Sequence, residues 1–332
     1  MKEEVRLDHL NEVVGNALDN LGLDIAERDT VRQVLMYAQL RGSSQGLVKI
    51  KERTVLPDKN CTEITVEQKT SSIARINGGG HTGMYVLHNA ATVAVDLVQH
   101  AGIALVSTHN TRSSTGSIGF YANRIAASGY IAMVLAGSPK VMAMEGGIDP
   151  VFGTNPVAIA IPANNEPLVL DMATADTTWF AVINARDNNQ TLAPGAAIDA
   201  DGKPTINPVE AMQGALRTFG GAKGSGLALM FEFLTAVLGN ASTLGDAHDN
   251  RSNTIIAIDP SAIDGDFKNR ASDFIAGLKQ TRPVDNAGTE ASIRLPGEQS
   301  NARAARCIDE NKVVIDSALY RYLLELALVT GN

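Results

Sequence analysis

Residues 115–162 read TGSIGFYANRIAASGYIAMVLAGSPKVMAMEGGIDPVFGTNPVAIAIP, a stretch in which a helical pattern gives way to short apolar segments. Apolar residues three and four apart predict a helix over 117–128. The segments 130–137, 156–162 and 168–173 are short and apolar, and Gly, Pro and Asn separate them, which is typical of strands. The middle of the chain is therefore expected to form a sheet.

Further helices and strands are expected on both sides of this middle. The spacing of their apolar residues predicts these elements, and a Gly marks the end of several of the helices. No internal repeat is present, and the mixture of elements indicates an α/β or α+β fold. The expected elements are two helices within 5–40, the second starting at Asp29-Thr30, strands over 71–76, 103–110 and 253–260, and helices over 84–100, 225–238 and 316–329.

The composition is that of a stably folded protein. The chain has 332 residues, of which 44% are hydrophobic, and its net charge is −8. An acidic balance without a basic stripe argues against a nucleic-acid partner. The N-terminus is too polar for a signal peptide, and no apolar run reaches the roughly 18 residues of a membrane span. A cytoplasmic protein without a membrane partner is expected.

Cysteines and histidines give no sign of a disulfide framework or a metal centre. Cys61 and Cys307 are isolated, which favours reduced thiols. The six histidines form no HxH or HExxH pair, so no catalytic metal is expected.

A glycine loop raises the question of a dinucleotide-binding turn. Residues 75–90, RINGGGHTGMYVLHNA, contain Gly78-x-Gly80-x-x-Gly83 between a predicted strand and a predicted helix. The following strand lacks the acidic residue that would hold a ribose, although Arg112 suits a 2′-phosphate. Three interpretations remain open: a simple turn before a helix, phosphate contact of another kind, and a Rossmann turn.

Several motifs together resemble the type-2 malate/L-lactate dehydrogenase family, whose relatives include ureidoglycolate, sulfolactate and diketogulonate dehydrogenases and Δ1-piperideine-2-carboxylate reductases. Besides residues 115–162, they are LVLDMATA (168–175), GGAKGSGLALMFEFLTAVLG (220–239) and RLPGE (294–298). The resemblance extends from residue 38 to 298. It implies an α/β, α+β-like chain that binds NAD or NADP without a Rossmann fold, in a largely antiparallel sheet, and that is usually a homodimer.

The same resemblance implies a domain division and a set of site residues. A helical, substrate-side domain would comprise 1–75 with 285–332, and the cofactor-binding domain 76–284. For Gly224, close packing at a helix start is an equal alternative; Ser138 could be a simple turn serine, and 152–156 a rigid turn. The implied cofactor contacts are Ile118, Asp171, Met172, Ala173, Thr174, Lys223, Gly224, Gly297 and Glu298, and the implied substrate-side serine is Ser138.

This sequence departs from the family pattern where proton transfer is expected. The usual His of an SHG motif is matched by Gln45, and a second family histidine by Ser114. Neither side chain titrates near neutral pH, although Gln45 can still orient a carbonyl or imine by hydrogen bonding. The family arginine that suits a small carboxylate substrate is matched by Lys49, which keeps the charge without the bidentate fork.

The proton donor would then be another group. His81 in the glycine loop, His109 and Asp171 are candidates, with surface, strand-end and turn-capping roles as their alternatives. Two functions remain open. The chain is an oxidoreductase on a small 2-oxo, 2-hydroxy or cyclic 2-imino acid with altered acid and base groups, or a non-catalytic or weakly active homologue that binds a nucleotide or small anion.

Overall fold

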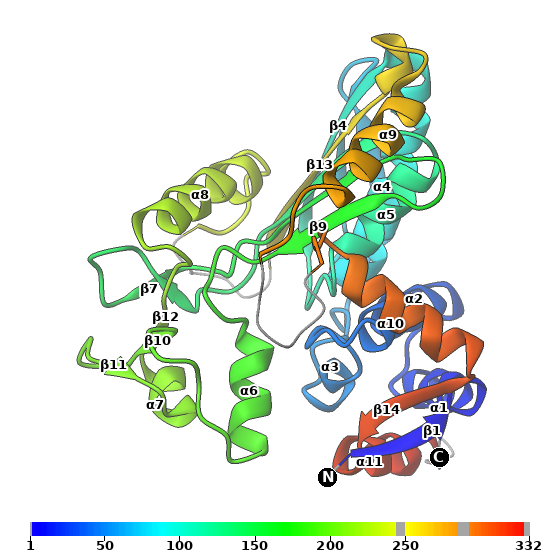
Figure 1. The fold of residues 1–332 in the computed structure, drawn as a ribbon. Coiled ribbons are helices and arrows are strands. Elements are labelled where there is room, and N and C mark those ends of the chain that lie inside the picture. Colours follow the sequence, from blue (N-terminus) through cyan, green and yellow to red (C-terminus); the bar gives the residue numbers. More distant parts are fainter. Residues whose placement is uncertain (1, 244–249, 285–291, 329–332) are drawn as a thin grey trace.

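The computed structural model describes residues 2–243, 250–284 and 292–328, and its centre is a seven-stranded sheet (Figure 1). Among the described strands of this sheet, β3 and β4 run parallel and every other neighbouring pair is antiparallel. The predicted largely antiparallel, non-Rossmann architecture is thus confirmed. In spatial order the strands are β2 (Thr65–Gln68), β3 (Ile73–Asn77), β4 (Ile103–Thr111), β13 (Arg251–Ile258), β5 (Ile131–Ala136), β8 (Val157–Ile161) and β9 (Leu168–Met172).

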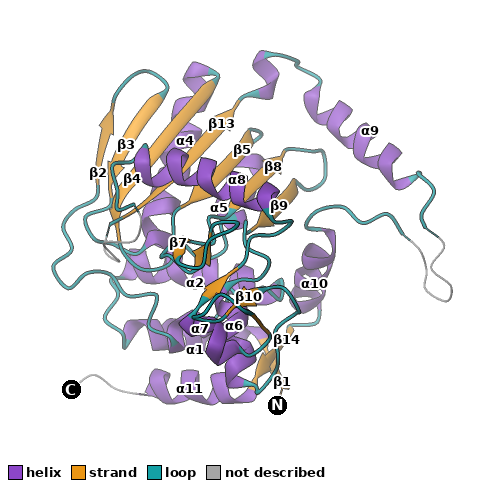
Figure 2. Cartoon of the chain, turned by 90° about the vertical axis from the view of Figure 1, so that its left-hand side faces the viewer, coloured by secondary structure: helices purple, strands orange, loops and turns teal. Residues whose placement is uncertain are grey.

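Helices cover both faces of this sheet (Figure 2). On one face α4 (Gly83–Ala101) contacts β4 and β13, while α5 (Gly119–Ala127) contacts β5, β8 and β9. Successive residues of β13 alternate between the faces, because strand side chains point in opposite directions. Ile255 lies in the main hydrophobic core. Its neighbour Thr254 donates to the carbonyl of Leu234, 2.6 Å away, in the π-helical turn Phe233–Val237 on the other face.

The two ends of the chain form one layer together, seen in blue and red in Figure 1. Helix α1 packs on α11, α10 on α2, and α11 on α3. Strand β1 pairs with β14, so that Lys2 lies opposite Asp316. The elements are β1 (Lys2–Arg6), α1 (Leu7–Asp19), α2 (Ile25–Leu40), α3 (Val48–Lys51), α10 (Glu298–Asp309), β14 (Lys312–Asp316) and α11 (Ser317–Leu328).

The predicted domain division stays a prediction. Strand β3 crosses the predicted boundary at residue 75 and belongs to the central sheet. Residues 285–291 and 329–332 of the predicted C-terminal segment lie outside the described residues.

A second, smaller unit lies beside the central sheet, at the left of Figure 1. Its core is separate from the main one and contains Met142, Phe152, Val182 and Leu216. In the described parts of the chain, no helix combines the length and the apolarity needed to cross a bilayer. The remaining elements, most of them in this unit, are β6 (Met142–Ala143), β7 (Pro150–Phe152), α6 (Trp179–Asp187), β10 (Ala197–Ile198), β11 (Pro204–Thr205), α7 (Pro208–Gln213), β12 (Ala215–Leu216), α8 (Ala222–Glu232) and α9 (Phe267–Lys279).

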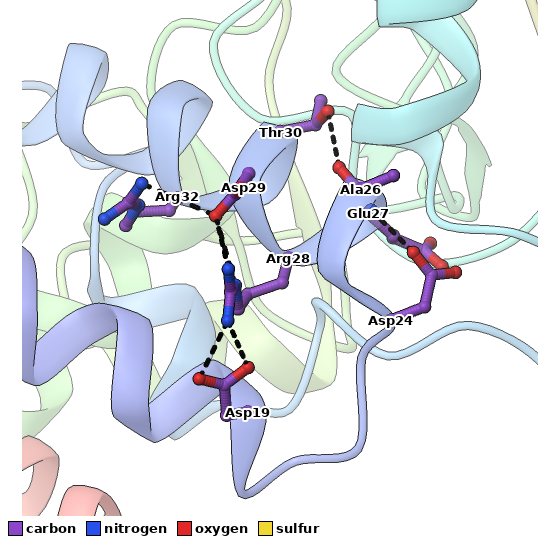
Figure 3. Close-up of polar contacts among 8 residues, drawn as sticks. All are labelled: Asp19, Asp24, Ala26, Glu27, Arg28, Asp29, Thr30 and Arg32. Atoms are coloured by element: carbon purple, nitrogen blue, oxygen red, sulfur yellow. Dashed lines mark hydrogen bonds and ion pairs between the residues drawn. The ribbon is translucent and has the colours of Figure 1, made fainter.

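The start predicted for the second helix, at Asp29-Thr30, is wrong. Helix α2 begins at Ile25, and the Asp24 side chain caps it by accepting a hydrogen bond of 2.9 Å from Glu27 N (Figure 3). Thr30 lies inside the helix, where its hydroxyl donates to the carbonyl of Ala26. Asp24 precedes the residues whose periodicity carried the prediction, so the pattern placed the start too late.

The backbone of residues 58–62 packs against the glycine loop and hydrogen-bonds to it. Gly79 has a φ of 60°, and a Cβ there would lie 2.2 Å from the carbonyl oxygen of Thr62. The amide of Thr62 donates to the carbonyl of Gly79, and that of Asp58 to the carbonyl of Gly80, each at 2.8 Å. The loop therefore serves as a tight turn between β3 and α4, the first of the three interpretations.

Candidate active site

A cavity of about 350 Å³ lies where the N-terminus of α5, the ends of β5 and β9, α3 and α6 meet. Its lining combines apolar groups with convergent polar and charged ones, as small-molecule sites do. Residues from distant parts of the chain are brought together here, in the ranges 43–54, 114–118, 137–141, 154–156 and 171–183 and at position 251. The predicted site residues that line the cavity are Gln45, Lys49, Ser114, Ile118, Ser138, Asp171, Met172 and Ala173.

Lys49 is buried in this lining. Its side chain is 1% exposed, and Nζ lies 3.5 Å from the ring centroid of Phe180 on α6. Burial, and secondly the guanidinium of Arg251, lowers the pKa of the Lys49 ammonium well below its usual range. Burial and Arg251 thus disfavour the Lys49 ammonium, while the face of the Phe180 ring favours it.

Arg251 lines the same cavity and was missed by the sequence analysis. It is the first residue of β13, just before the predicted strand 253–260, and donates through Nη1 to the carbonyl of Ser113. The available signal was a charged residue just before the polar first half of the strand, Ser252–Thr254. The distance of about 200 residues from Lys49 hid their proximity.

Asp171 joins β9 to the start of α5. Its Oδ2 accepts hydrogen bonds from Ser117 Oγ at 2.6 Å and from the Gly119 amide at 2.9 Å. The Asp171 side chain is exposed where it opens onto the cavity, but the protein around the cavity removes part of its water, which raises the pKa of the carboxyl group, while the two hydrogen bonds oppose the rise. Asp171 thus anchors one wall and presents a carboxyl group to the space beside it.

Helix α6 forms a wall that the sequence analysis did not predict. Thr178 caps it by accepting from Ala181 N, and its hydroxyl lies 2.9 Å from Ser44 Oγ in the loop that carries Gln45. At the other end of the helix, Asp187 forms an ion pair of 3.0 Å with Lys51. These two contacts hold α6 against the loop and α3. The threonine before an apolar run was the signal for this helix.

The two residues that replace the family histidines both reach the cavity. Gln45 is partly buried, and its backbone amide donates to Ser43 Oγ at 3.2 Å. Ser114 Oγ accepts from the amide of Gly116 at 3.1 Å, and so supports the turn before α5. Neither side chain supplies a group that titrates near neutral pH.

Ser138 has a structural partner as well as a place in the cavity wall. Its Oγ accepts a hydrogen bond of 3.0 Å from the amide of Thr154. This bond ties the end of β5 to the turn between β7 and β8. In that turn Asn155 is fully buried and donates to Glu232 Oε2 at 2.8 Å. These bonds hold the segment 152–156 as a turn between two strands, and Thr154 and Pro156 of this turn also line the cavity, so its role as a rigid turn stays a prediction.

His81 does not line the cavity. Its Nδ1 lies 2.9 Å from Glu27 Oε2, and the other carboxylate oxygen of Glu27 accepts from the amide of Thr82 at 2.7 Å. His81 thus connects the glycine loop with α2. No local pattern around His81 signalled a buried acidic partner on α2.

Five residues predicted as cofactor contacts also lie outside the lining. Thr174 is buried and donates to the carbonyl of Thr154 at 2.9 Å. A Cβ on Gly224 would lie 2.2 Å from the carbonyl of Phe219, which explains this glycine by close packing at the start of α8. A coenzyme-binding role for these five residues stays a prediction. The others are Lys223 in the first turn of α8, and Gly297 and Glu298 at the start of α10, where Glu298 pairs with Lys279.

Asp24, Glu27 and His81 form a mixed cluster outside the cavity. One potential ligand atom from each lies within 4.8 Å of the other two. The cap from Asp24 to the Glu27 amide and the contact of Glu27 with His81 explain this proximity by hydrogen bonding alone. The expectation that the protein uses no catalytic metal stays a prediction.

Comparison with known proteins agrees with the motifs. A model of the malate/L-lactate dehydrogenase family matches residues 5–324. The chain is 30% identical over 304 residues to the L-sulfolactate dehydrogenase of Methanothermobacter thermautotrophicus, covering 86% of this chain and 87% of that one. It is 31% identical over 277 residues to Delta(1)-pyrroline-2-carboxylate reductase 1 of Burkholderia ambifaria, covering 79% and 78%. The crystal structure of a dehydrogenase from Sinorhizobium meliloti matches with a TM-score of 0.87 at 28% identity, over 98% of both chains.

Proposed function

We propose that this chain, which belongs to the malate/L-lactate dehydrogenase family, transfers a hydride between NAD or NADP and a small carboxylate. Membership of the family makes it a nicotinamide-dependent dehydrogenase or reductase. The reacting carbon would carry a 2-oxo or 2-hydroxy group, or belong to a cyclic 2-imino acid. One observation carries the proposal: Lys49 and Arg251 share a cavity with Asp171 and Met172.

The cavity suits a nicotinamide ring with a small acid beside it. Its volume of about 350 Å³ is at the lower end of the range for ligand sites, so the rest of a dinucleotide would extend beyond it. Ile118, Met172 and Ala173 would contact the flat ring, and Asp171 offers a polar anchor. When bound, the coenzyme supplies or accepts the hydride. Lys223, Gly224, Gly297 and Glu298 remain proposals for its more distant parts.

The substrate carboxylate would lie at the cationic end of the cavity. Arg251 keeps its charge at every relevant pH and offers a planar fork of donors, which matches a carboxylate. Lys49 lies on the same wall and adds positive charge whenever its amine is protonated. Gln45 would hydrogen-bond to the reacting oxygen or nitrogen and orient it.

Coenzyme binding and turnover test this function. We expect titration calorimetry to detect binding of NADH or NADPH. The absorbance of the reduced nicotinamide should then report turnover with one class among 2-oxo acids, 2-hydroxy acids and cyclic imino acids. A protein that binds neither coenzyme would contradict the proposal. Binding of a coenzyme without turnover of any class would instead favour the non-catalytic homologue.

An exposed apolar surface favours a homodimer. The sequence predicted a helix over 225–238, and most of the large apolar side chains in this segment are exposed in the structure. Figure 1 shows α8 standing apart from the central sheet. An apolar face of this kind is typical of a protein interface, and we propose that a second copy of the chain covers it. We call it the α8 face; its residues are Leu227, Met230, Phe233, Leu234, Val237 and Leu238, which are 41–52% exposed.

A charge on the α8 face should prevent dimerisation. Leu234→Glu is expected to sediment as a monomer, because a carboxylate buried in an apolar interface without a partner costs several kcal/mol. Ile263→Glu is the matched control, since Ile263 is 86% exposed and lies elsewhere. A dimeric Leu234→Glu variant, or a monomeric wild-type chain, would exclude this interface. The cytoplasmic location and the lack of a nucleic-acid partner stay predictions from composition.

A further inference from the structure

We propose that Lys49 is the proton donor of the reaction: its Nζ protonates the substrate's carbonyl oxygen or imine nitrogen as the hydride arrives, an inference that rests on the proposed function of the cavity. The sequence had suggested Lys49 as a carboxylate-binding residue. Its surroundings favour a different task, because the same wall also carries an arginine.

The geometry around Lys49 is that of a poised amine and not of an ion pair. Its side chain is 1% exposed and lines the cavity, and Nζ lies over the ring of Phe180. Within residues 2–243, 250–284 and 292–328, no carboxylate lies within ion-pair distance of Nζ. Lys51, two residues later, contrasts with it through its 3.0 Å pair with Asp187. A buried ammonium without a carboxylate is easily deprotonated.

Of the charged groups that face Lys49, the cation lowers its pKa further, and the carboxylates lie beyond ion-pair distance. Arg251 repels the ammonium and, after burial itself, is the second cause of its lowered pKa. The carboxyl groups of Asp171 and Glu52 line the same cavity without forming an ion pair with Nζ. An acid works best when its pKa approaches the working pH, and a lysine shifted downward from its ordinary value approaches that condition.

The other groups of the cavity are poorer donors. Gln45 and Ser114 do not titrate near neutral pH. Asp171 has a raised pKa, but both of its described hydrogen bonds come from donors, Ser117 and Gly119, that stabilise the ionised form. His81 is held by Glu27 outside the lining.

The proton from Lys49 completes the reduction that the hydride begins. A hydride reaches C2, so the substrate is reduced and the dihydronicotinamide oxidised. The π pair of the C=O or C=N bond forms a new O–H or N–H bond with the proton of Lys49, while the N–H bond of the ammonium breaks. The neutral amine regains a proton from water before the next turnover. Arg251 keeps the carboxylate in place and carries no proton in this step.

The assignment fixes the sign of the pH dependence. Reduction needs protonated Lys49, so kcat should fall as the pH rises through the lysine's pKa. Oxidation needs the neutral amine, so its kcat should rise over the same interval. Because the pKa of Lys49 is lowered, both changes should occur below the ordinary lysine value of 10.5.

Two variants separate proton donation from charge. Lys49→Met removes the amine, and Lys49→Arg keeps a positive charge that cannot be given up; both should lower kcat for a 2-oxo acid about 10²-fold or more, with a smaller change in KM. A protonated cyclic imine should lose much less. Lys69→Met, at an exposed lysine paired with Glu67, is the control and should keep the wild-type rate. Normal kcat in Lys49→Arg, or a rise confined to KM in Lys49→Met, would overturn the assignment.

A direct titration provides a readout that does not depend on activity. The wild-type chain labelled with carbon-13 at lysine Cε would be followed by NMR as the pH is raised, and the signal absent from Lys49→Met is that of Lys49. It should titrate at lower pH than the signals of the other lysines; titration together with them would overturn the proposal. If the wild-type chain turns over while Lys49 titrates normally, only this assignment fails. If the chain binds no coenzyme, the proposed function fails and the assignment with it.

Discussion

Arg251→Met is expected to raise the KM for the carboxylate substrate about 10²-fold and to change kcat much less, because removing one partner of a buried charged hydrogen-bond pair costs roughly 2–5 kcal/mol. The guanidinium lies at the start of β13, beside Lys49 and within the cavity lining. It is the one of these two cations that stays charged throughout the working pH range. Initial-rate kinetics over a range of substrate concentrations would measure the effect.

Three further measurements make this expectation specific. Arg251→Lys keeps the charge without the fork and should give an intermediate KM. Arg270→Met, at an exposed arginine paired with Asp264, should keep the wild-type KM. Arg251 also donates to the carbonyl of Ser113, so thermal unfolding should be recorded for each variant to detect a purely structural loss. A folded Arg251→Met variant with the wild-type KM would place the carboxylate elsewhere.

Glu27→Ala is expected to lower the free energy of unfolding by about 1–3 kcal/mol, the usual cost of leaving a buried hydrogen-bond donor without its acceptor. The Glu27 side chain is 2% exposed and serves two partners, His81 Nδ1 and the amide of Thr82. Without it, the amide of Thr82, a fully buried residue, loses its acceptor at the point where the glycine loop meets α4. Denaturation with urea would measure the loss.

Two matched variants distinguish this site from ordinary surface pairs. Glu27→Gln keeps an oxygen acceptor and should lose less than Glu27→Ala. Asp29 lies two residues after Glu27 on α2, and its partly exposed carboxylate pairs with Arg28 and Arg32, as Figure 3 shows. Asp29→Ala removes these exposed pairs and should cost less than about 1 kcal/mol. Equal stabilities of Glu27→Ala and Asp29→Ala would show that the contact between α2 and the glycine loop contributes little.

The sequence predicted the elements whose signals are local. The helix that became α4 was placed to within a residue at each end, because Gly102 closes it in a left-handed conformation. Strand β1 was not predicted, since its five residues alternate between exposed and half-buried and it gains its pairing partner 310 residues later, at β14. The two-residue strands β6, β10, β11 and β12 are too short for any periodicity to be read.

Some residues of the candidate site could be predicted from local motifs, and the others depend on how distant elements pack. Gln45, Lys49 and Asp171 were found because each lies within a recognisable motif, and the fold brings all three to one cavity. Arg251 and Phe180 lie in no motif, and their relevance depends on where β13 and α6 are packed. His81 was attractive as a replacement acid only while its partner was unknown. A carboxylate 54 residues away on α2, buried in the folded chain, was not visible in the local pattern.

The pairing of β1 with β14 has a consequence for synthesis. Residues 2–6 are synthesised long before their hydrogen-bonding partners, residues 312–316, and α1 and α3 both pack on α11, which follows those partners. During translation residues 2–6 therefore stay without their native partners until residues 312–316 have been made. Because α3 carries Lys49, this part of the cavity should reach its native packing only once α11 has been synthesised.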